Sequence, residues 1–318
     1  MTPPTDAQFY AQMTLIRQTE QAFFDLYARG LMAGTVHTSI GQEAGAVGVI
    51  AALDRKCDVI FSNHRAHGHF LAYCDDVEGL VAELLGRRTG VVGGVGGTQH
   101  LHTRNLYTNG IQGGIVPNAV GAALAEKLDG SGAIVTVFLG DGTMGEGVVY
   151  ESMNLAALWQ LPVLFVLEDN HYAQSTPKHL EHAGSLADRP RAFGIATHDL
   201  TGGPAHTMAG ALDVTEVYAA ACTAAAYVRE HSAPYFLALP TYRLAPHSKG
   251  DDTRQSDELA AAWSRDPLER IGGRLEPGER AQLDVTAANR VRQAIDAALA
   301  EAPQSLTDFA AGARWQPA

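Results

Sequence analysis

The chain has 318 residues, of which 46% are hydrophobic and 18% are charged, and its formal net charge is −12. This length and composition suit one large α/β domain or two modest ones. Because no basic cluster offsets the negative charge, we do not expect a nucleic acid or an anionic membrane as the main partner. Small molecules and proteins are better candidates.

The N-terminus and the cysteines predict a cytoplasmic protein. Residues 1–6 lack a basic stretch followed by an apolar core, and no run approaches about eighteen apolar residues. Cys57, Cys74 and Cys222 are odd in number and widely spaced. That pattern favours reduced, mostly buried thiols over disulfides or a zinc site.

Helices are predicted at both ends of the chain. Residues 6–29 place large apolar side chains near one face and are followed by Gly30, which predicts an amphipathic helix. Residues 256–271 and 279–299 predict two more helices, separated by glycine and proline. We therefore divide one α/β domain, residues 1–318, into an N-terminal helical arm (1–30), an α/β core (31–255) and C-terminal helices with a tail (256–318).

Between these ends, apolar runs predict strands that are buried on both faces. The runs span residues 58–61, 133–139, 162–167 and 234–239. Residues 146–159 have helical spacing, so they predict a helix between two parallel strands. Asp213 and Glu216 form a capping-box variant that opens an alanine-rich helix to about Val228. This alternation predicts a doubly wound, mainly parallel sheet.

Polar residues follow two of the predicted strands where each strand ends. Asp141 lies between Gly140 and Gly142 after one run, and Asn170 follows the next run. Neighbouring strands lie about 4.8 Å apart, so the two side chains can reach one small object. Open parallel sheets bind ligands at this edge, and a carboxylate with an amide oxygen beside a diphosphate suits Mg²⁺. The glycines let phosphate and metal approach the backbone closely.

The order of short motifs resembles a known family. Gly140-Asp-Gly142, followed by Asn170 and Tyr172, is similar to the thiamine diphosphate fingerprint. From about residue 6 to 271 the chain resembles the alpha subunit of the decarboxylating component of 2-oxoacid dehydrogenase complexes, of the pyruvate, branched-chain 2-oxoacid and acetoin types. The further motifs are His37-x-x-x-Gly41-Gln-Glu43, His64-Arg-Ala-His-Gly68, Gly96-Gly-Thr-Gln-His100, Asn109-Gly110, Val116-Pro117, Ala173-Gln-Ser-Thr176 and Tyr242-Arg243…His247-Ser248-Lys-Gly-Asp251-Asp252.

The resemblance implies a site for thiamine diphosphate and Mg²⁺. Asp141, Asn170 and the Tyr172 carbonyl correspond to magnesium ligands. Arg65 corresponds to a diphosphate-binding arginine, whose planar fork can donate two hydrogen bonds at once. His247 corresponds to a histidine between diphosphate and substrate, where a neutral imidazole can relay protons. The implied cofactor-binding residues are His64, Arg65, Gly110, Gln112, Gly140, Asp141, Gly142, Asn170, Tyr172 and His247, and the implied catalytic residues are His247 and His37.

The sequence also departs from the family pattern. Gln112 stands where an apolar residue usually meets the aminopyrimidine ring, and His64 stands where a tyrosine is usual. Asp169 replaces a common asparagine, Ala245-Pro246 replace a glycine and often a histidine, and residues from about 195 to 212 fit the family poorly. These changes leave the identity of the substrate open more than the binding of the cofactor.

The resemblance implies decarboxylation of a 2-oxoacid with transfer of the acyl group to a lipoyl carrier. The chain would be half of the active site, because a beta subunit supplies a glutamate and the second half in a heterotetramer of two alpha and two beta subunits. Two alternatives remain open: ligation of the acyloin-forming or transketolase-like kind, and a non-catalytic scaffold subunit. His37, His67 and His100 match family histidines that either support loops or act in catalysis. A nucleotide loop at residues 93–97 is disfavoured, since the Gly-Lys-Ser/Thr of a P-loop is missing.

Overall fold

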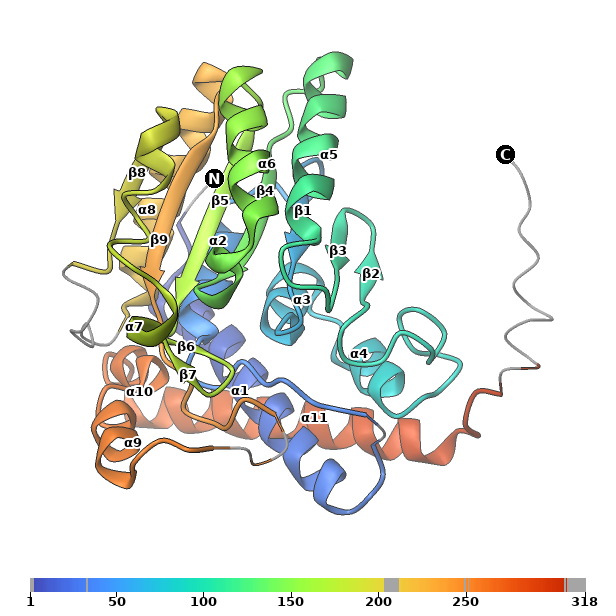
Figure 1. Cartoon of the computed structure of the whole chain (residues 1–318). Coiled ribbons are helices and arrows are strands. Elements are labelled where there is room, and N and C mark those ends of the chain that lie inside the picture. Colours follow the sequence, from blue (N-terminus) through green and yellow to red (C-terminus); the bar gives the residue numbers. More distant parts are fainter. Residues whose placement is uncertain are drawn as a thin grey trace.

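A computed structural model describes residues 3–32, 34–202, 212–248, 250, 252–305 and 307. Asp251 and most of the 195–212 segment, from residue 203 to 211, therefore lie outside the described residues. Within the described residues, seven strands form one sheet in the order β2-β3-β1-β4-β5-β9-β8 (Figure 1). The strands are β1 (Val59–Ser62), β2 (His102–Thr103), β3 (Leu106–Thr108), β4 (Val135–Gly140), β5 (Val163–Asp169), β8 (Ala196–Asp199) and β9 (Tyr235–Pro240), with a separate pair β6 (Tyr172–Ala173) and β7 (Thr176–Pro177).

Neighbouring strands of the large sheet are parallel, except for the antiparallel pair β2 and β3. The helices are α1 (Asp6–Ala28), α2 (Glu43–Ala51), α3 (His67–Cys74), α4 (Val77–Leu84), α5 (Ile115–Asp129), α6 (Gly147–Leu158), α7 (Lys178–Glu181), α8 (Val214–His231), α9 (Ser256–Trp263), α10 (Pro267–Gly272) and α11 (Pro277–Ala300), with 3-10 turns at Gly142–Gly145 and Pro190–Phe193.

Alternate side chains of the central strand β5 supply two separate cores. Val163, Phe165 and Leu167 pack in a cluster that contains residues of α5 and α6. Leu164 and Val166 pack in the other cluster, which contains residues of α1, α2 and α8. Successive side chains of a strand point to opposite faces, so a strand that is apolar throughout needs helices on both sides. The predicted doubly wound, mainly parallel α/β sheet is confirmed.

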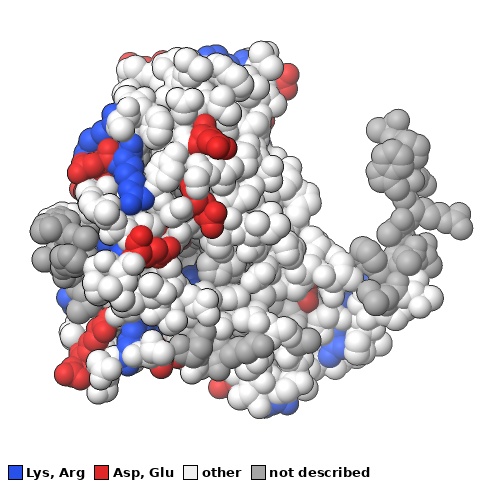
Figure 2. Space-filling model, in the orientation of Figure 1, with Lys and Arg blue, Asp and Glu red and all other residues white. Residues whose placement is uncertain are grey.

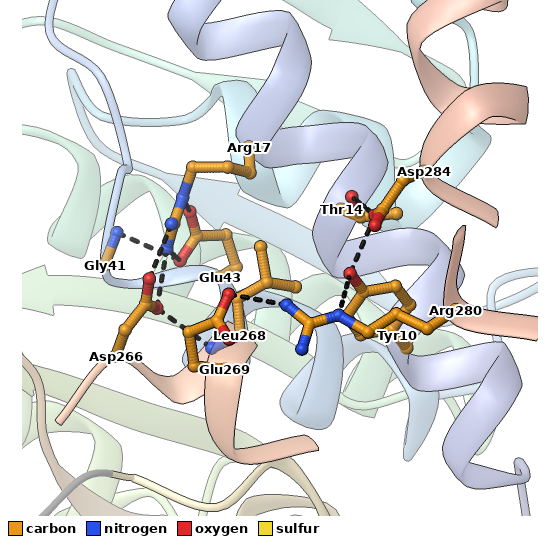
Figure 3. A network of polar contacts seen from close by, with 10 residues as sticks. All are labelled: Tyr10, Thr14, Arg17, Gly41, Glu43, Asp266, Leu268, Glu269, Arg280 and Asp284. Atoms are coloured by element: carbon orange, nitrogen blue, oxygen red, sulfur yellow. Dashed lines mark hydrogen bonds and ion pairs between the residues drawn. The ribbon is translucent and has the colours of Figure 1, made fainter. Parts of the chain in front are cut away.

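The N-terminal helix and the C-terminal helices pack together below the sheet in the view of Figure 1. The long helices α1 and α11 lie side by side there (Figure 1), with α10 and α2 also against α1. A buried ion network joins three of these helices (Figure 3): Arg17 of α1 contacts Glu43 of α2 at 2.6 Å and Asp266, the N-cap of α10, at 2.7 Å. The N-terminal arm is therefore fixed to the core and to the C-terminal helices by charge as well as by packing.

Two sequence predictions need correction. Residues 256–271 do not form one helix, because the chain breaks between α9 and α10, where Asp266 caps the backbone N–H of Leu268 and Pro267 occupies the first turn. The thiols are free, as expected, but they are not mostly buried: Cys57 is exposed, and Cys74 and Cys222 are half-buried.

On the face shown in Figure 2, Lys and Arg lie in small separate groups with Asp and Glu between them. Among the described residues, no helix combines the length and the apolar character that crossing a membrane requires.

Candidate active site

A cavity of about 390 Å³ opens at the carboxyl ends of the parallel strands. Its walls are the loops that follow β1, β3, β4, β5 and β9, together with the segments before α2 and before β2. Every residue that the sequence assigned to cofactor, metal or catalysis lines this cavity. These residues are His37, His64, Arg65, Gly110, Gln112, Gly140, Asp141, Gly142, Asn170, Tyr172 and His247. The structure thus brings together side chains that are spread over 211 positions of the sequence, from 37 to 247.

Asp141 and Asn170 follow neighbouring strands, as the sequence predicted. Gly140 pairs with Glu168 in the β4–β5 register, so both side chains lie just beyond the paired ends of the strands. Asn170 is 8% exposed, and its Oδ1 accepts a hydrogen bond from the backbone N–H of Tyr172 at 3.1 Å. The amide is held in place and keeps acceptor capacity on its oxygen.

The carboxyl group of Asp141 is buried and only half satisfied. Its Oδ1 accepts a hydrogen bond from the Gly142 N–H at 3.1 Å, whereas its Oδ2 has no hydrogen-bond partner among the described residues. Burial raises the pKa of Asp141 to about 7, with a further contribution from the nearby charge of Asp169. Burying a carboxyl oxygen without a hydrogen-bond partner costs free energy, so binding of a cation or a proton at this oxygen would stabilise the site.

Arg65 joins three loops of the cavity wall. It is 5% exposed, and its Nη1 donates to the carbonyl oxygen of Thr38 at 2.5 Å. Its Nη2 lies 3.4 Å from both the carbonyl oxygen and the Nδ1 of His247. A guanidinium stays charged at any physiological pH, so this side of the cavity offers a fixed positive charge to an anion.

Three imidazoles meet beside Arg65. The ring centroid of His37 lies 4.8 Å from those of His64 and His247, in edge-to-face arrangements, and the last two centroids lie 5.7 Å apart. Burial, followed by the charge of Arg65, lowers the pKa of His64 well below its ordinary value. His64 is therefore neutral near pH 7.

The two unusual residues of the cavity, Gln112 and His64, contact each other. Gln112 Nε2 lies 2.6 Å from His64 Nδ1, and Gln112 Oε1 accepts a hydrogen bond from the Thr143 hydroxyl at 2.8 Å. From the sequence alone these looked like two separate departures from the family pattern. They form one hydrogen-bonded unit that crosses the cavity wall.

Some residues that shape the cavity were not found from the sequence. Arg254 donates to the carbonyl oxygens of Arg243 and Ala245, at 2.5 and 2.8 Å, in the loop that carries His247. Its guanidinium also lies over the ring of Tyr242, 5.1 Å from the centroid. The local sequence carries no signal for such contacts. The cavity is further lined by Gln99, Thr143, Glu146, Ala173, Gln174 and Glu181.

The other family histidines differ in their surroundings. His67 is fully buried between Glu20, at 3.0 Å, and the Thr98 hydroxyl, at 2.6 Å, which is a supporting position behind the cavity. His100 is exposed and is absent from the described cavity wall. In the glycine-rich segment 93–97, three backbone N–H groups are bound by Glu83, so they are not available to a nucleotide phosphate.

Comparison with known proteins agrees with this geometry. The family model described as dehydrogenase E1 component matches residues 11–309. The pyruvate dehydrogenase E1 component subunit alpha of Zymomonas mobilis is 37% identical over 301 residues, which cover 91% of this chain and 82% of that protein. The alpha subunit of the acetoin:2,6-dichlorophenolindophenol oxidoreductase of Bacillus subtilis is 38% identical over 246 residues, 76% of this chain and 71% of that protein. This chain belongs to the dehydrogenase E1 component family, as an alpha subunit of the thiamine-diphosphate-dependent 2-oxoacid dehydrogenases.

Proposed function

We propose that this chain binds thiamine diphosphate through Mg²⁺ held by Asp141, Asn170 and the Tyr172 carbonyl. The observation that carries the proposal is the buried Asp141 Oδ2, which has no hydrogen-bond partner among the described residues. A divalent cation would supply the missing opposite charge and stabilise the ionised carboxylate. Carboxylate, amide and carbonyl oxygens are the ligands that Mg²⁺ prefers, and phosphate oxygens and water would complete its shell. The residues present therefore fit the ion.

The rest of the cavity suits the cofactor itself, including its diphosphate. Arg65 would hold the diphosphate, with His64 and His247 as further polar contacts. At Gly142 a Cβ would lie 2.7 Å from the Ala173 Cβ, so glycine is required there for the packing of the cavity wall, and at Gly110 a Cβ would lie 2.2 Å from the end of the Gln99 side chain. A Cβ at Gly140 would meet no protein atom within 4 Å, so the absence of a side chain there leaves the backbone open to a ligand.

When bound, thiamine diphosphate supplies the carbanion chemistry of decarboxylation. The residues of this chain would bind and orient the cofactor, and His247 and His37 would hold or move a proton at an imidazole nitrogen on the substrate side. Their convergence with His64 on the cavity wall supports this role, because imidazole is the side chain whose proton exchange falls nearest to neutral pH.

We also propose the partners that the alpha-subunit type implies. A beta subunit would cover the open side of the cavity and supply the glutamate that protonates the cofactor, in a heterotetramer of two alpha and two beta chains. The acyl group would pass to a lipoyl-bearing acyltransferase. Relatives named for pyruvate dehydrogenase and for acetoin oxidation support the general reaction, and they leave the choice of substrate and acceptor to experiment.

The decisive experiment is calorimetry of thiamine diphosphate binding to the alpha chain co-purified with its beta subunit, with and without Mg²⁺. We expect Mg²⁺-dependent binding that Asp141→Ala abolishes while the fold is kept. Asp129→Ala, an exposed carboxylate at the end of α5, is the matched control and should bind normally. Unchanged cofactor affinity in Asp141→Ala would refute the assignment.

Activity measurements then separate the possible reactions. The alpha–beta pair is given a panel of 2-oxoacids and acetoin with an artificial electron acceptor, and then with a lipoyl domain. Acylation of the lipoyl domain supports the dehydrogenase reaction. Condensation products without acylation indicate ligation, and cofactor binding without turnover of any substrate indicates a scaffold subunit.

A further inference from the structure

The imidazoles of His37, His64 and His247 come from three separate segments and converge on one point of the cavity. One ring nitrogen can be chosen from each so that the three atoms all lie within 4.8 Å of one another. His37 precedes α2, His64 follows β1 and His247 follows β9, so the convergence is produced by the fold and not by local spacing.

We propose that these three histidines form a binding site for one Zn²⁺-type cation, and that this cation and the cofactor diphosphate exclude each other from the cavity. The metal site stands on the histidine geometry. The mutual exclusion rests on the proposed function, because it requires the diphosphate to use His64 and His247.

The ligand type selects this class of metal. Neutral imidazole suits Zn²⁺, Co²⁺, Ni²⁺ and Cu²⁺, whereas Mg²⁺ prefers oxygen ligands such as those at Asp141 and Asn170. Three histidines with water in the fourth position is a common open zinc arrangement. With zinc–nitrogen distances of about 2.0–2.1 Å, tetrahedral ligands lie about 3.4 Å apart. The imidazoles must therefore approach one another by up to about 1.4 Å; His37 is buried, so most of this shift would fall to His64 and His247, which are half-buried side chains on loops.

Two of the imidazoles are contacted by side-chain amides outside the proposed metal position. The Nδ1 atom of His37 lies 3.2 Å from the Gln99 amide, and that of His64 lies 2.6 Å from the Gln112 amide. In both contacts the amide nitrogen faces Nδ1, so Nε2 carries the proton in the metal-free chain. Metal binding through Nε2 would require each amide to rotate and present its oxygen to Nδ1, which fixes the proton there in the usual arrangement around a metal-binding histidine. The Nε2 atom of His64 is buried and has no hydrogen-bond partner among the described residues. At His247 the long contact with Arg65, 3.4 Å, is the one that metal binding would replace.

The cavity wall carries charges of both signs. Its described lining contains one guanidinium, that of Arg65, and three carboxyl groups, those of Asp141, Glu146 and Glu181. The wall as a whole therefore carries more acidic than basic groups, but Arg65 lies beside the three imidazoles, and a cation bound there would have to displace the contact between Arg65 and His247. A cation held by the histidines would occupy nitrogen atoms that the diphosphate needs, and the two ligands could not bind together.

The test uses the full-length chain, freed of metal and studied alone and with its beta subunit. Co²⁺ is titrated and followed by visible absorption, because cobalt on a few nitrogen ligands absorbs far more strongly than octahedral cobalt on oxygen ligands, and Zn²⁺ is then used to displace it. We expect one cobalt ion per alpha chain. His64→Tyr should leave the thermal unfolding curve unchanged and weaken cobalt affinity. Because loss of an outer contact alone costs roughly 10–100-fold in metal affinity, loss of a ligand should cost at least as much.

Two control variants separate this site from others. His231→Asn removes an exposed histidine of α8, and Asp141→Asn removes the proposed magnesium ligand; both should keep the cobalt signal. Equal cobalt affinity in the native chain and in His64→Tyr, or no nitrogen-type signal at all, would overturn the metal site.

Competition is measured separately. Thiamine diphosphate with Mg²⁺ should remove the cobalt signal in proportion to its own binding. If the cofactor binds and the signal persists, the mutual exclusion is wrong. A third outcome separates the two proposals. If cobalt binds and depends on the histidines, but thiamine diphosphate does not bind under any condition, the proposed function is wrong and the metal site is still supported.

Discussion

The carboxylate of Glu83 accepts a hydrogen bond from the backbone N–H of Gly96 at 2.7 Å. The N–H groups of Val92, Gly94 and Gly97 donate to the same carboxylate at 2.8–3.0 Å. Glu83 is 1% exposed, so one buried side chain holds the whole glycine-rich loop. That loop leads directly to Gln99 in the cavity wall.

Glu83→Gln should therefore disturb both stability and cofactor binding. The amide NH₂ would face backbone donors in place of an acceptor, which we expect to cost about 1–3 kcal/mol in the free energy of unfolding. Urea unfolding and calorimetry of cofactor binding would measure the two effects. Glu78→Gln is the matched control, since Glu78 lies on the same helix and is exposed. Equal stability of the two variants would contradict the role given to Glu83.

A larger loss of stability is expected for Arg17→Met. The substitution leaves the carboxylates of Glu43 and Asp266, 0% and 3% exposed, without their cation. Breaking a buried ion pair in this way costs about 3–5 kcal/mol in the free energy of unfolding. Arg191→Met, which removes one half of an exposed pair with Asp188, should change it by less than about 1 kcal/mol. Denaturant unfolding of both variants tests the contrast.

Arg254→Met should weaken cofactor binding more than it weakens the fold. The side chain fixes the loop of His247 through the Arg243 and Ala245 carbonyl oxygens. We expect cofactor affinity to fall about tenfold, equivalent to about 1.4 kcal/mol. Arg290→Met on α11 serves as the control and should bind the cofactor normally. Full affinity in Arg254→Met would show that the loop keeps its shape without this guanidinium.

The raised pKa of Asp141 predicts an unusual pH dependence in cation-free protein. Its folded value of about 7 lies above the ordinary value of 3.8, so the folded chain binds the extra proton between these pH values. The contribution of Asp141 to stability is therefore fully present below about pH 4 and is lost as the pH rises through 7. In urea unfolding, native protein should lose more stability than Asp141→Asn between about pH 5 and pH 8. Parallel pH profiles for the two proteins would contradict the shift.

Much of the site could be predicted because strand ends and motifs are local signals. The continuous apolar runs of β4 and β5 correctly predicted that Asp141 and Asn170 follow the ends of neighbouring strands. The order of the motifs predicted the other residues that line the cavity. Helix α2 was missed because it is buried on nearly all sides, so its sequence, residues 43–51, has no polar face to reveal a helical period. Strands of two or three residues, such as β2 and β3, are too short to show alternation.

The contacts that hold the loops could not be predicted, since they join distant parts of the chain. Arg17 and Asp266 are separated by 249 positions, and Gln112 and His64 by 48. One missed feature did have a local signal. Asp266 followed by Pro267 is a typical helix start, and this pair marks the break between α9 and α10.

The contact between Gln112 and His64 limits how this cavity can be redesigned. Valine at position 112 would leave both the Thr143 hydroxyl and the imidazole of His64 without their present partner. A library that varies only one of the two positions therefore breaks this contact, whereas a library that varies both positions together can replace the two residues as a pair.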